Sequence, residues 1–151
     1  MRIATSNDKI DLSSEKKTEE LAKKISKKIK LGDIIFLYGD MGVGKTTFIK
    51  YLINSLQKKN KLKITEVTSP TFNLLNEYKI NQIKINHYDL FRIKSDKELI
   101  NLDLFGESQD SITLIEWPQI IKEKPNHLIE LEFQYKNDYK KRSVFIKGLS
   151  L

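Results

Sequence analysis

The stretch Gly39-Asp40-Met41-Gly42-Val43-Gly44-Lys45-Thr46 has the spacing G-x-x-x-x-G-K-S/T of a phosphate-binding loop. An apolar run precedes it at residues 34–38 and is typical of a buried strand, whereas residues 48–56 continue as a helix. The glycines let the backbone turn where a Cβ would clash, so successive N–H groups can point at phosphate oxygens. This order of strand, loop and helix favours a real phosphate site over a glycine-rich turn that matches by chance.

Each residue type in the loop has an expected role. Lys45 would reach the β and γ phosphates of a nucleotide, and the Thr46 hydroxyl would be a ligand of Mg²⁺. The positive N-terminal end of the following helix adds to the attraction for the anion. We therefore predict a site for a nucleotide and Mg²⁺. The predicted cofactor-binding residues of the loop are Gly39, Asp40, Met41, Gly42, Val43, Gly44, Lys45, Thr46 and Thr47.

Size and composition predict a single domain over residues 1–151. A chain of this length buries about 68 to 70% of its unfolded surface, so it needs no disulfides to fold. The sequence has no cysteine, which excludes disulfides and thiolate metal sites and fits a reducing compartment. The N-terminus turns polar before the apolar core of a signal peptide can form, and no apolar run approaches the roughly 18 residues of a membrane span. We expect a soluble, cytoplasmic protein that does not contact a membrane.

The chain is basic, with a formal net charge of +7 from 27 basic and 20 acidic residues. Only three of the basic residues are arginine: Arg2, Arg92 and Arg142. Sequence-specific recognition of nucleic acids depends on the planar fork of arginine, so a surplus made of lysine is weak support for it. Lysines spread over solvated faces are the simpler interpretation, and direct contact with RNA stays open.

The remaining pattern alternates strands and helices. The expected strands are 9–12, 64–67, 74–80, 83–90, 112–115, 128–135 and 142–147. One helix is expected to begin at Ser13 or Ser14 and to stop at Gly32, and another is expected to begin at Ser95. Residues 74–90 and 128–147 each read as a hairpin. The fold class that follows is α/β, a three-layer domain similar to P-loop NTPases on a mixed, mostly parallel sheet with hairpin additions.

Two acids sit at the carboxyl ends of predicted strands and are the candidate catalytic and metal-binding carboxylates. They are Asp89, in His87-Tyr88-Asp89-Leu90, and Glu116, in Leu114-Ile115-Glu116-Trp117. Ligands of open α/β sheets bind at the carboxyl ends of strands, where both acids are expected. We assign Asp89 to Mg²⁺ and Glu116 to orienting or deprotonating the attacking water, and these roles are open to exchange.

Three further residues are candidates at the same edge. Thr71, in a proline-containing loop, could sense the γ-phosphate through its hydroxyl. Trp117 could pack over the nucleotide, present its ring to a partner, or belong to the core. His87 could lie beside the metal or the γ-phosphate, although a histidine at a strand end is more often a structural hydrogen-bonding residue.

Four motifs in this order resemble the TsaE (YjeE) family of small ATPases. They are residues 39–47, Ser69-Pro70-Thr71-Phe72 with Asn76-Glu77-Tyr78, His87-Tyr88-Asp89-Leu90-Phe91-Arg92, and Leu114-Ile115-Glu116-Trp117-Pro118. The resemblance spans nearly the whole chain and is far more specific than the loop alone. It puts Lys45, Thr46, Asp89, Glu116 and Trp117 on functional positions, and Lys45, Glu116 and Asp89 are the predicted catalytic residues. One departure is Gln119, where the family usually has an acid.

The resemblance implies a cytoplasmic, Mg-dependent ATPase that works with the TsaD and TsaB proteins. Together they make the threonylcarbamoyl modification on the adenosine beside the anticodon of tRNA, and the ATPase supports turnover of the complex. Two alternatives stay open. A small-molecule kinase is disfavoured because only Arg92 stands where an arginine of a closing lid could. A nucleotide-gated binding module would need a charge-stabilising group from its partner before it hydrolysed ATP.

Overall fold

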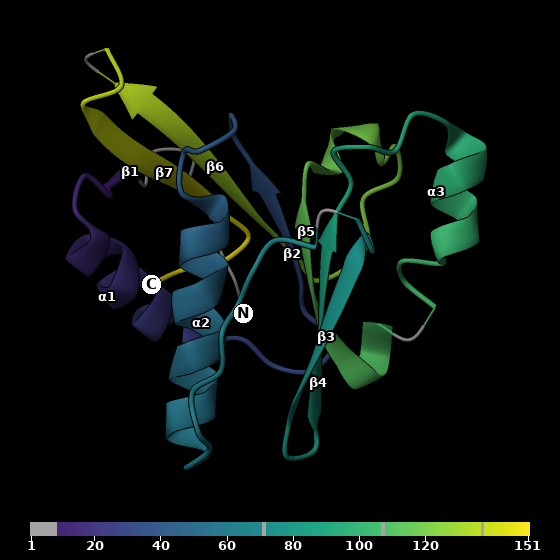
Figure 1. Ribbon diagram of the computed structural model, residues 1–151, viewed down its shortest axis with the longest axis horizontal. Coiled ribbons are helices and arrows are strands. Elements are labelled where there is room, and N and C mark those ends of the chain that lie inside the picture. The colour runs from purple at the N-terminus through teal and green to yellow at the C-terminus, as the bar shows by residue number, and fades with distance from the viewer. Residues whose placement is uncertain (1–8, 71, 107, 137) are drawn as a thin grey trace.

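The computed structural model describes residues 9–70, 72–106, 108–136 and 138–151, which build a seven-stranded mixed sheet with helices on both faces (Figure 1). The strand order is β1-β7-β6-β2-β5-β4-β3. The elements are β1 (Lys9–Asp11), α1 (Glu15–Ser26), β2 (Ile34–Tyr38), α2 (Lys45–Lys59), β3 (Leu75–Ile80), β4 (Ile83–Asp89), α3 (Asp96–Leu102), β5 (Ser111–Glu116), β6 (Leu128–Lys136) and β7 (Lys141–Lys147), with short 3₁₀ helices η1 (Ser108–Asp110) and η2 (Pro118–Ile120).

The centre of the sheet is parallel and its flanks are antiparallel. Strands β6, β2, β5 and β4 run in one direction, while β3 pairs with β4, and β7 pairs with β6 and β1, in the opposite sense. This arrangement confirms the predicted α/β class and both predicted hairpins. Because the central strands are parallel, β2, β5 and β4 end at one edge of the sheet, where residues from distant parts of the chain meet.

The alternating side chains of the central strands divide the core into two layers. On β2, Ile35 and Leu37 pack in the cluster that includes residues of α1 and α2, whereas Ile34 and Phe36 pack in a second cluster on the other face. Figure 1 shows α1 and α2 on one side of the sheet and α3 on the other. A strand covered on both faces needs apolar residues at successive positions, which explains the unbroken apolar run before the loop.

Helix α1 begins with a cap that the sequence predicts. The hydroxyl of Ser14 accepts a hydrogen bond from the backbone N–H of Lys17 at 3.3 Å. The Asp11 carboxylate accepts one from the N–H of Ser13 and lies 2.7 Å from Nζ of Lys17. The lysine, followed by the Ser13 hydroxyl, lowers the pKa of Asp11 to about 2. The charged carboxylate therefore ties β1 to the start of α1.

Replacing Asp11 with asparagine should make the stability difference between the variant and the parent protein depend on pH. The pKa of Asp11 is depressed in the folded chain, so its contribution is present above its ordinary value of 3.8 and is lost as the pH falls to about 2. Thermal unfolding followed by circular dichroism should give a small decrease in Tm at neutral pH, since exposed ion pairs contribute little. The decrease should vanish near pH 2, and a decrease that stays constant across this range would contradict the assignment.

Two local predictions differ from the structure. The strand predicted at residues 64–67 is wrong, because that segment is irregular. The side chain of Gln57 accepts a hydrogen bond from the backbone N–H of Thr65 at 3.2 Å and donates one to the Thr65 hydroxyl at 2.8 Å. The N–H of Thr65 is therefore not available for pairing with a neighbouring strand. Helix α1 also ends at Ser26, earlier than the stop expected near Gly32.

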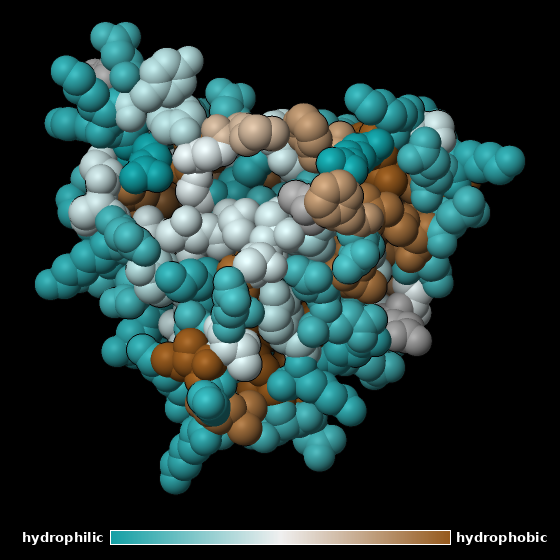
Figure 2. Space-filling view, in the orientation of Figure 1, coloured by the Kyte–Doolittle hydropathy of each residue, from teal (hydrophilic) through white to brown (hydrophobic). Residues whose placement is uncertain are grey.

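The surface is largely hydrophilic, as the charged fraction of 31% leads one to expect. Figure 2 shows hydrophilic side chains over most of this face, with apolar areas on the α3 side and beside the lower half of α2. The large apolar side chains with the highest exposure include Ile100 of α3 at 74% and Phe72 at 80%. Among the described residues, no helix combines the length and the apolar character that crossing a membrane requires.

Candidate functional site

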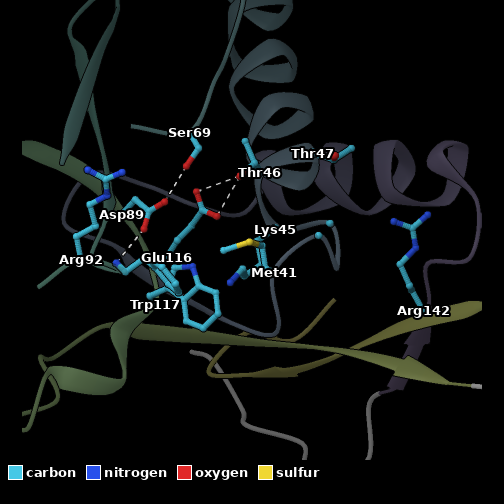
Figure 3. A pocket seen from close by; sticks show the side chains of 13 residues that line it. Met41, Lys45, Thr46, Thr47, Ser69, Asp89, Arg92, Glu116, Trp117 and Arg142 are labelled. Atoms are coloured by element: carbon cyan, nitrogen blue, oxygen red, sulfur yellow. Dashed lines mark hydrogen bonds between the residues drawn. The ribbon is translucent and has the colours of Figure 1, made fainter. Parts of the chain in front are cut away.

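A cavity of about 330 Å³ opens at the carboxyl ends of β4 and β5, beside the N-terminus of α2 (Figure 3). Residues from five separated stretches of the chain meet there. The lining residues are Met41, Gly42, Gly44, Lys45, Thr46, Thr47, Ser69, Asp89, Phe91, Arg92, Glu116, Trp117 and Arg142. The cavity therefore joins the predicted phosphate loop to both predicted acids.

The loop depends on glycine at position 39, where the backbone has φ +144°. A Cβ built on Gly39 would lie 2.8 Å from Cγ1 of Val43 and 3.0 Å from Cβ of Phe133, so the Val43 side chain would have to move and the Phe133 contact would be very tight. Gly44, at the start of α2, has φ +114°. The sequence folds into this loop because both glycines adopt a left-handed conformation that a side chain would strain.

Replacing Gly39 with alanine should destabilise the protein by about 3 kcal/mol, from the strain of a left-handed backbone and the overpacking of the new methyl group. Gly32→Ala is the matched control, because Gly32 also has a positive φ, +94°, but nothing lies within 4 Å of a Cβ built on it. Its cost should be about 1 kcal/mol. Urea unfolding measures both, and equal costs would show that packing around Gly39 is unimportant.

Lys45 is buried at the base of the cavity, with 5% of its surface exposed. Its ammonium donates to the carbonyl of Gly39 at 2.5 Å and lies 3.6 Å from the centre of the Trp117 ring. Burial lowers the pKa of Lys45, and the charges of Glu116, Asp89 and Asp40 oppose this shift. A carbonyl and an aromatic face offset only part of the free energy that an ammonium loses when it leaves water. A bound phosphate would supply the negative charge that pairs with it.

Glu116 ends β5 and points at the first turn of α2 (Figure 3). The hydroxyl of Thr46 lies 3.1 Å from Oε1 and 3.3 Å from Oε2 of this carboxylate. A hydroxyl that donates its proton keeps its oxygen lone pairs free for a metal ion. On its other side, Nε2 of His87 lies 2.7 Å from Oε2 of Glu116.

Asp89 ends β4 and lies directly opposite Glu116 in the parallel ladder between β4 and β5. One oxygen of the Asp89 carboxylate accepts a hydrogen bond from the Ser69 hydroxyl at 2.7 Å, and the other accepts one from the N–H of Phe91 at 2.9 Å. These donors fix the carboxylate at the rim of the cavity. Its 9% exposure leaves it accessible from the cavity side.

The donor set fits Mg²⁺ bound together with a nucleotide. Within the described ranges, no three side chains of His, Cys, Asp or Glu gather into a metal cage. Mg²⁺ does not require one, because it keeps several waters and usually takes one or two carboxylates together with phosphate oxygens. The Thr46 hydroxyl and a carboxylate oxygen of Glu116 or Asp89 are the oxygen ligands that it prefers.

The structure brings together most of the predicted site residues. Met41, Gly42, Gly44, Thr46 and Thr47 line the cavity together with Lys45, Asp89, Glu116 and Trp117. Three predicted loop residues do not line it: Gly39 contacts Lys45 through its carbonyl, Val43 is buried in the core, and Asp40 lies in a shallow depression beside the β6–β7 hairpin. The predicted Thr71 lies outside the described residues. Gln119 is exposed and is not among the lining residues.

The predicted site residues omit four contributors to the cavity: Ser69, Phe91, Arg92 and Arg142. Of these, Arg92 was considered only as the arginine of a closing lid. Ser69 and Phe91 lie in two of the four motifs. The sequence signal that could have identified Phe91 is its position two residues after the predicted carboxylate Asp89, and for Ser69 it is a hydroxyl in the loop beside the predicted site. Arg142 belongs to β7, and nothing in the surrounding sequence marks it as a site residue. It reaches the cavity only because β7 folds back along β6, which neighbours β2.

In the parallel centre of the sheet, β2 leads through a glycine loop into α2, and an acid ends the adjacent strand β5. This arrangement defines a P-loop nucleotide-binding protein. The family model for Threonylcarbamoyl adenosine biosynthesis protein TsaE matches residues 12–144. The chain belongs to the TsaE family, which confirms the resemblance inferred from the motifs.

Individual relatives agree with this membership. The chain is 40% identical over 136 residues to a protein of Rickettsia bellii named tRNA threonylcarbamoyladenosine biosynthesis protein TsaE, covering 89% of this chain and 92% of that one. It is 37% identical over 132 residues to a protein of the same name from Aquifex aeolicus, covering 87% and 91%. The crystal structure of Bacillus subtilis YdiB superposes with a TM-score of 0.69 at 24% identity, covering 94% of this chain and 85% of that one, which supports the fold.

Proposed function

We propose that this protein is the ATP-binding and ATP-hydrolysing component of the machinery that makes threonylcarbamoyladenosine in tRNA. Membership of the TsaE family gives the pathway, the biosynthesis of that modified nucleoside. The step within the pathway is our inference, and one observation carries it. The P-loop Thr46 and the strand-end Glu116 are hydrogen-bonded at 3.1 Å inside a cavity that Lys45 also lines.

The proposed binding of ATP follows from the loop and the start of α2. Backbone N–H groups of the loop would point at the phosphates, and the ammonium of Lys45 would exchange the Gly39 carbonyl for phosphate oxygens. Thr46 and Glu116 would hold Mg²⁺, which neutralises charge on the phosphate oxygens when bound. The ring of Trp117 lies 3.6 Å from the ammonium of Lys45 and would help to hold it beside the phosphates.

The contacts favour exchanging the roles first assigned to the two acids. Because Glu116 accepts a hydrogen bond from the hydroxyl of the P-loop Thr46, we assign it to the metal side. Among the residues that the structure describes, the Asp89 carboxylate makes no hydrogen bond with Thr46. It accepts hydrogen bonds from Ser69 and Phe91 at the rim of the cavity instead. It is therefore the carboxylate that would accept a hydrogen bond from the attacking water and turn the water's lone pair toward the γ-phosphorus.

The family resemblance suggests the TsaD and TsaB proteins as partners, working with this chain in the cytoplasm. The position of Arg92 also favours a partner that moves this arginine toward the phosphates. The guanidinium of Arg92 lies 4.5 Å from the centre of the exposed Phe72 ring, so this arginine stacks at the mouth of the cavity. A second candidate function follows, a nucleotide-gated binding module whose hydrolysis becomes appreciable only when a partner reorders this rim.

The test is phosphate release from the purified chain with ATP or GTP, in Mg²⁺ or EDTA, alone and with TsaD and TsaB. We expect release with ATP that requires Mg²⁺ and rises when both partners are present. Absence of release under every condition, with ATP still bound, would leave only the gated module. Stoichiometric transfer of the γ-phosphate to a hydroxylated metabolite would instead identify a kinase, and absence of any nucleotide binding would overturn both proposals.

A further inference from the structure

A buried histidine contacts Glu116 from the side opposite Thr46. His87 has no exposed surface, and its Nε2 atom lies 2.7 Å from Oε2 of Glu116. His87 pairs with Leu114 in the ladder between β4 and β5, so Glu116 is its diagonal neighbour two residues further along β5. Alternation along β5 puts Leu114 and Glu116 on the sheet face that α1 and α2 cover.

We propose that His87 is a positioning residue, which donates a hydrogen bond from Nε2 to Glu116 and so holds that carboxylate in the orientation that Thr46 contacts. The inference rests on the proposed function only for its consequence, the binding of Mg²⁺ and ATP. The hydrogen bond itself is a property of the free protein.

The direction of the hydrogen bond follows from the chemistry of its two ends. An ionised carboxylate only accepts hydrogen bonds, so a bare Nε2 at 2.7 Å would set two lone pairs against each other. Glu116 is 2% exposed, and a charged group withdrawn from water needs donors to offset the lost hydration. Thr46 provides one donor, and a proton on Nε2 of His87 provides the second.

The second ring nitrogen of His87, Nδ1, makes no hydrogen bond, within the part of the chain that the structure describes, that could orient the imidazole. Nδ1 of His87 is buried and has no hydrogen-bond partner among the described residues. Either neutral tautomer leaves Nδ1 unpaired, but only the one with the proton on Nε2 satisfies the contact with Glu116. The ring is therefore anchored by packing within β4 and its neighbours, and its polar edge is directed at the carboxylate.

Two nearly isosteric variants separate positioning from packing. Glutamine at position 87 has an amide N–H that can take the place of Nε2–H, whereas methionine has a similar length and no donor. His87→Met should weaken the Mg²⁺-dependent affinity for ATP about 10- to 100-fold, the usual cost of losing the partner of a metal-binding carboxylate. Affinity for ATP in EDTA should change less than about 2-fold. His87→Gln should restore affinity in Mg²⁺ to within a few-fold of the parent.

The affinities can be read from the fluorescence of Trp117, the only tryptophan in the chain, which lines the cavity. His127→Asn is the control for histidine replacement, because His127 is exposed and asparagine tolerates its positive φ of 60°. If both His87 variants weaken binding equally in Mg²⁺ and in EDTA, the residue acts through packing alone and the proposal is wrong.

A second measurement needs neither nucleotide nor hydrolysis. Ring ¹⁵N shifts from two-dimensional NMR report which imidazole nitrogen carries a proton, and His127→Asn assigns the two histidines of the chain. We expect a proton on Nε2 of His87 in the free protein. A bare Nε2 would overturn the inference even if the protein hydrolyses ATP. Conversely, a protonated Nε2 in a protein that binds no nucleotide would leave this contact intact and remove only the proposed function.

Discussion

Replacing Lys45 with methionine is expected to weaken ATP binding by roughly 10²- to 10⁴-fold while leaving the folded protein at least as stable as the parent. Charge-assisted contacts with phosphate contribute about 1.5 to 3 kcal/mol each, and Lys45 would make two of them. Without a bound anion, the same ammonium is buried at 5% exposure with a carbonyl and a ring as contacts. Methionine has a similar shape and no charge to desolvate.

Isothermal titration calorimetry with ATP and Mg²⁺ measures the first effect, and thermal unfolding without nucleotide measures the second. Lys50→Met is the matched control, because Lys50 is an exposed lysine of the same helix. We expect an unchanged or higher Tm for Lys45→Met, because removing the buried charge should raise the free energy of unfolding by about 1 kcal/mol or less. ATP affinity that survives the replacement would remove Lys45 from the phosphate site.

The second large effect separates the two acids. Asp89→Asn should lower the rate of phosphate release by about 10²- to 10³-fold and leave ATP affinity within a few-fold, because removing a water-directing carboxylate spares the ground state. Glu116→Gln should instead weaken Mg²⁺-dependent ATP binding, since the amide accepts the hydrogen bond of Thr46 but provides no negative charge for the cation.

Titrating Mg²⁺ at fixed ATP distinguishes the variants, because excess Mg²⁺ should partly restore Glu116→Gln and should not restore Asp89→Asn. Glu66→Gln is a control on an exposed acid outside the cavity. If Asp89→Asn shows the Mg²⁺ dependence and Glu116→Gln does not, the roles are those first assigned from the sequence. If neither variant changes phosphate release, the cavity is not a site of hydrolysis.

Much of the fold was predictable because it is encoded locally. The order of strand, glycine loop and helix around residues 39–46, both hairpins and the cap of α3 at Ser95 follow from short patterns, and the structure confirms each of these local structures. The strand expected at residues 64–67 failed because its apolar pattern was weak and the side chain of Gln57 bound the backbone of Thr65. Local patterns do not reveal a competing partner that comes from a neighbouring helix.

The sequence by itself determined that a glycine loop between a strand and a helix would present Lys45 and Thr46, and that Asp89 and Glu116 would lie at the carboxyl ends of strands. Those facts depend on neighbours within a few residues, which the backbone geometry of glycine and the period of a strand control. Only the tertiary structure decided that β5 pairs with β2, so that Glu116 meets Thr46 across 70 residues of chain, and that β7 carries Arg142 to the cavity. Strand order results from packing a two-sided core, and no short segment encodes it.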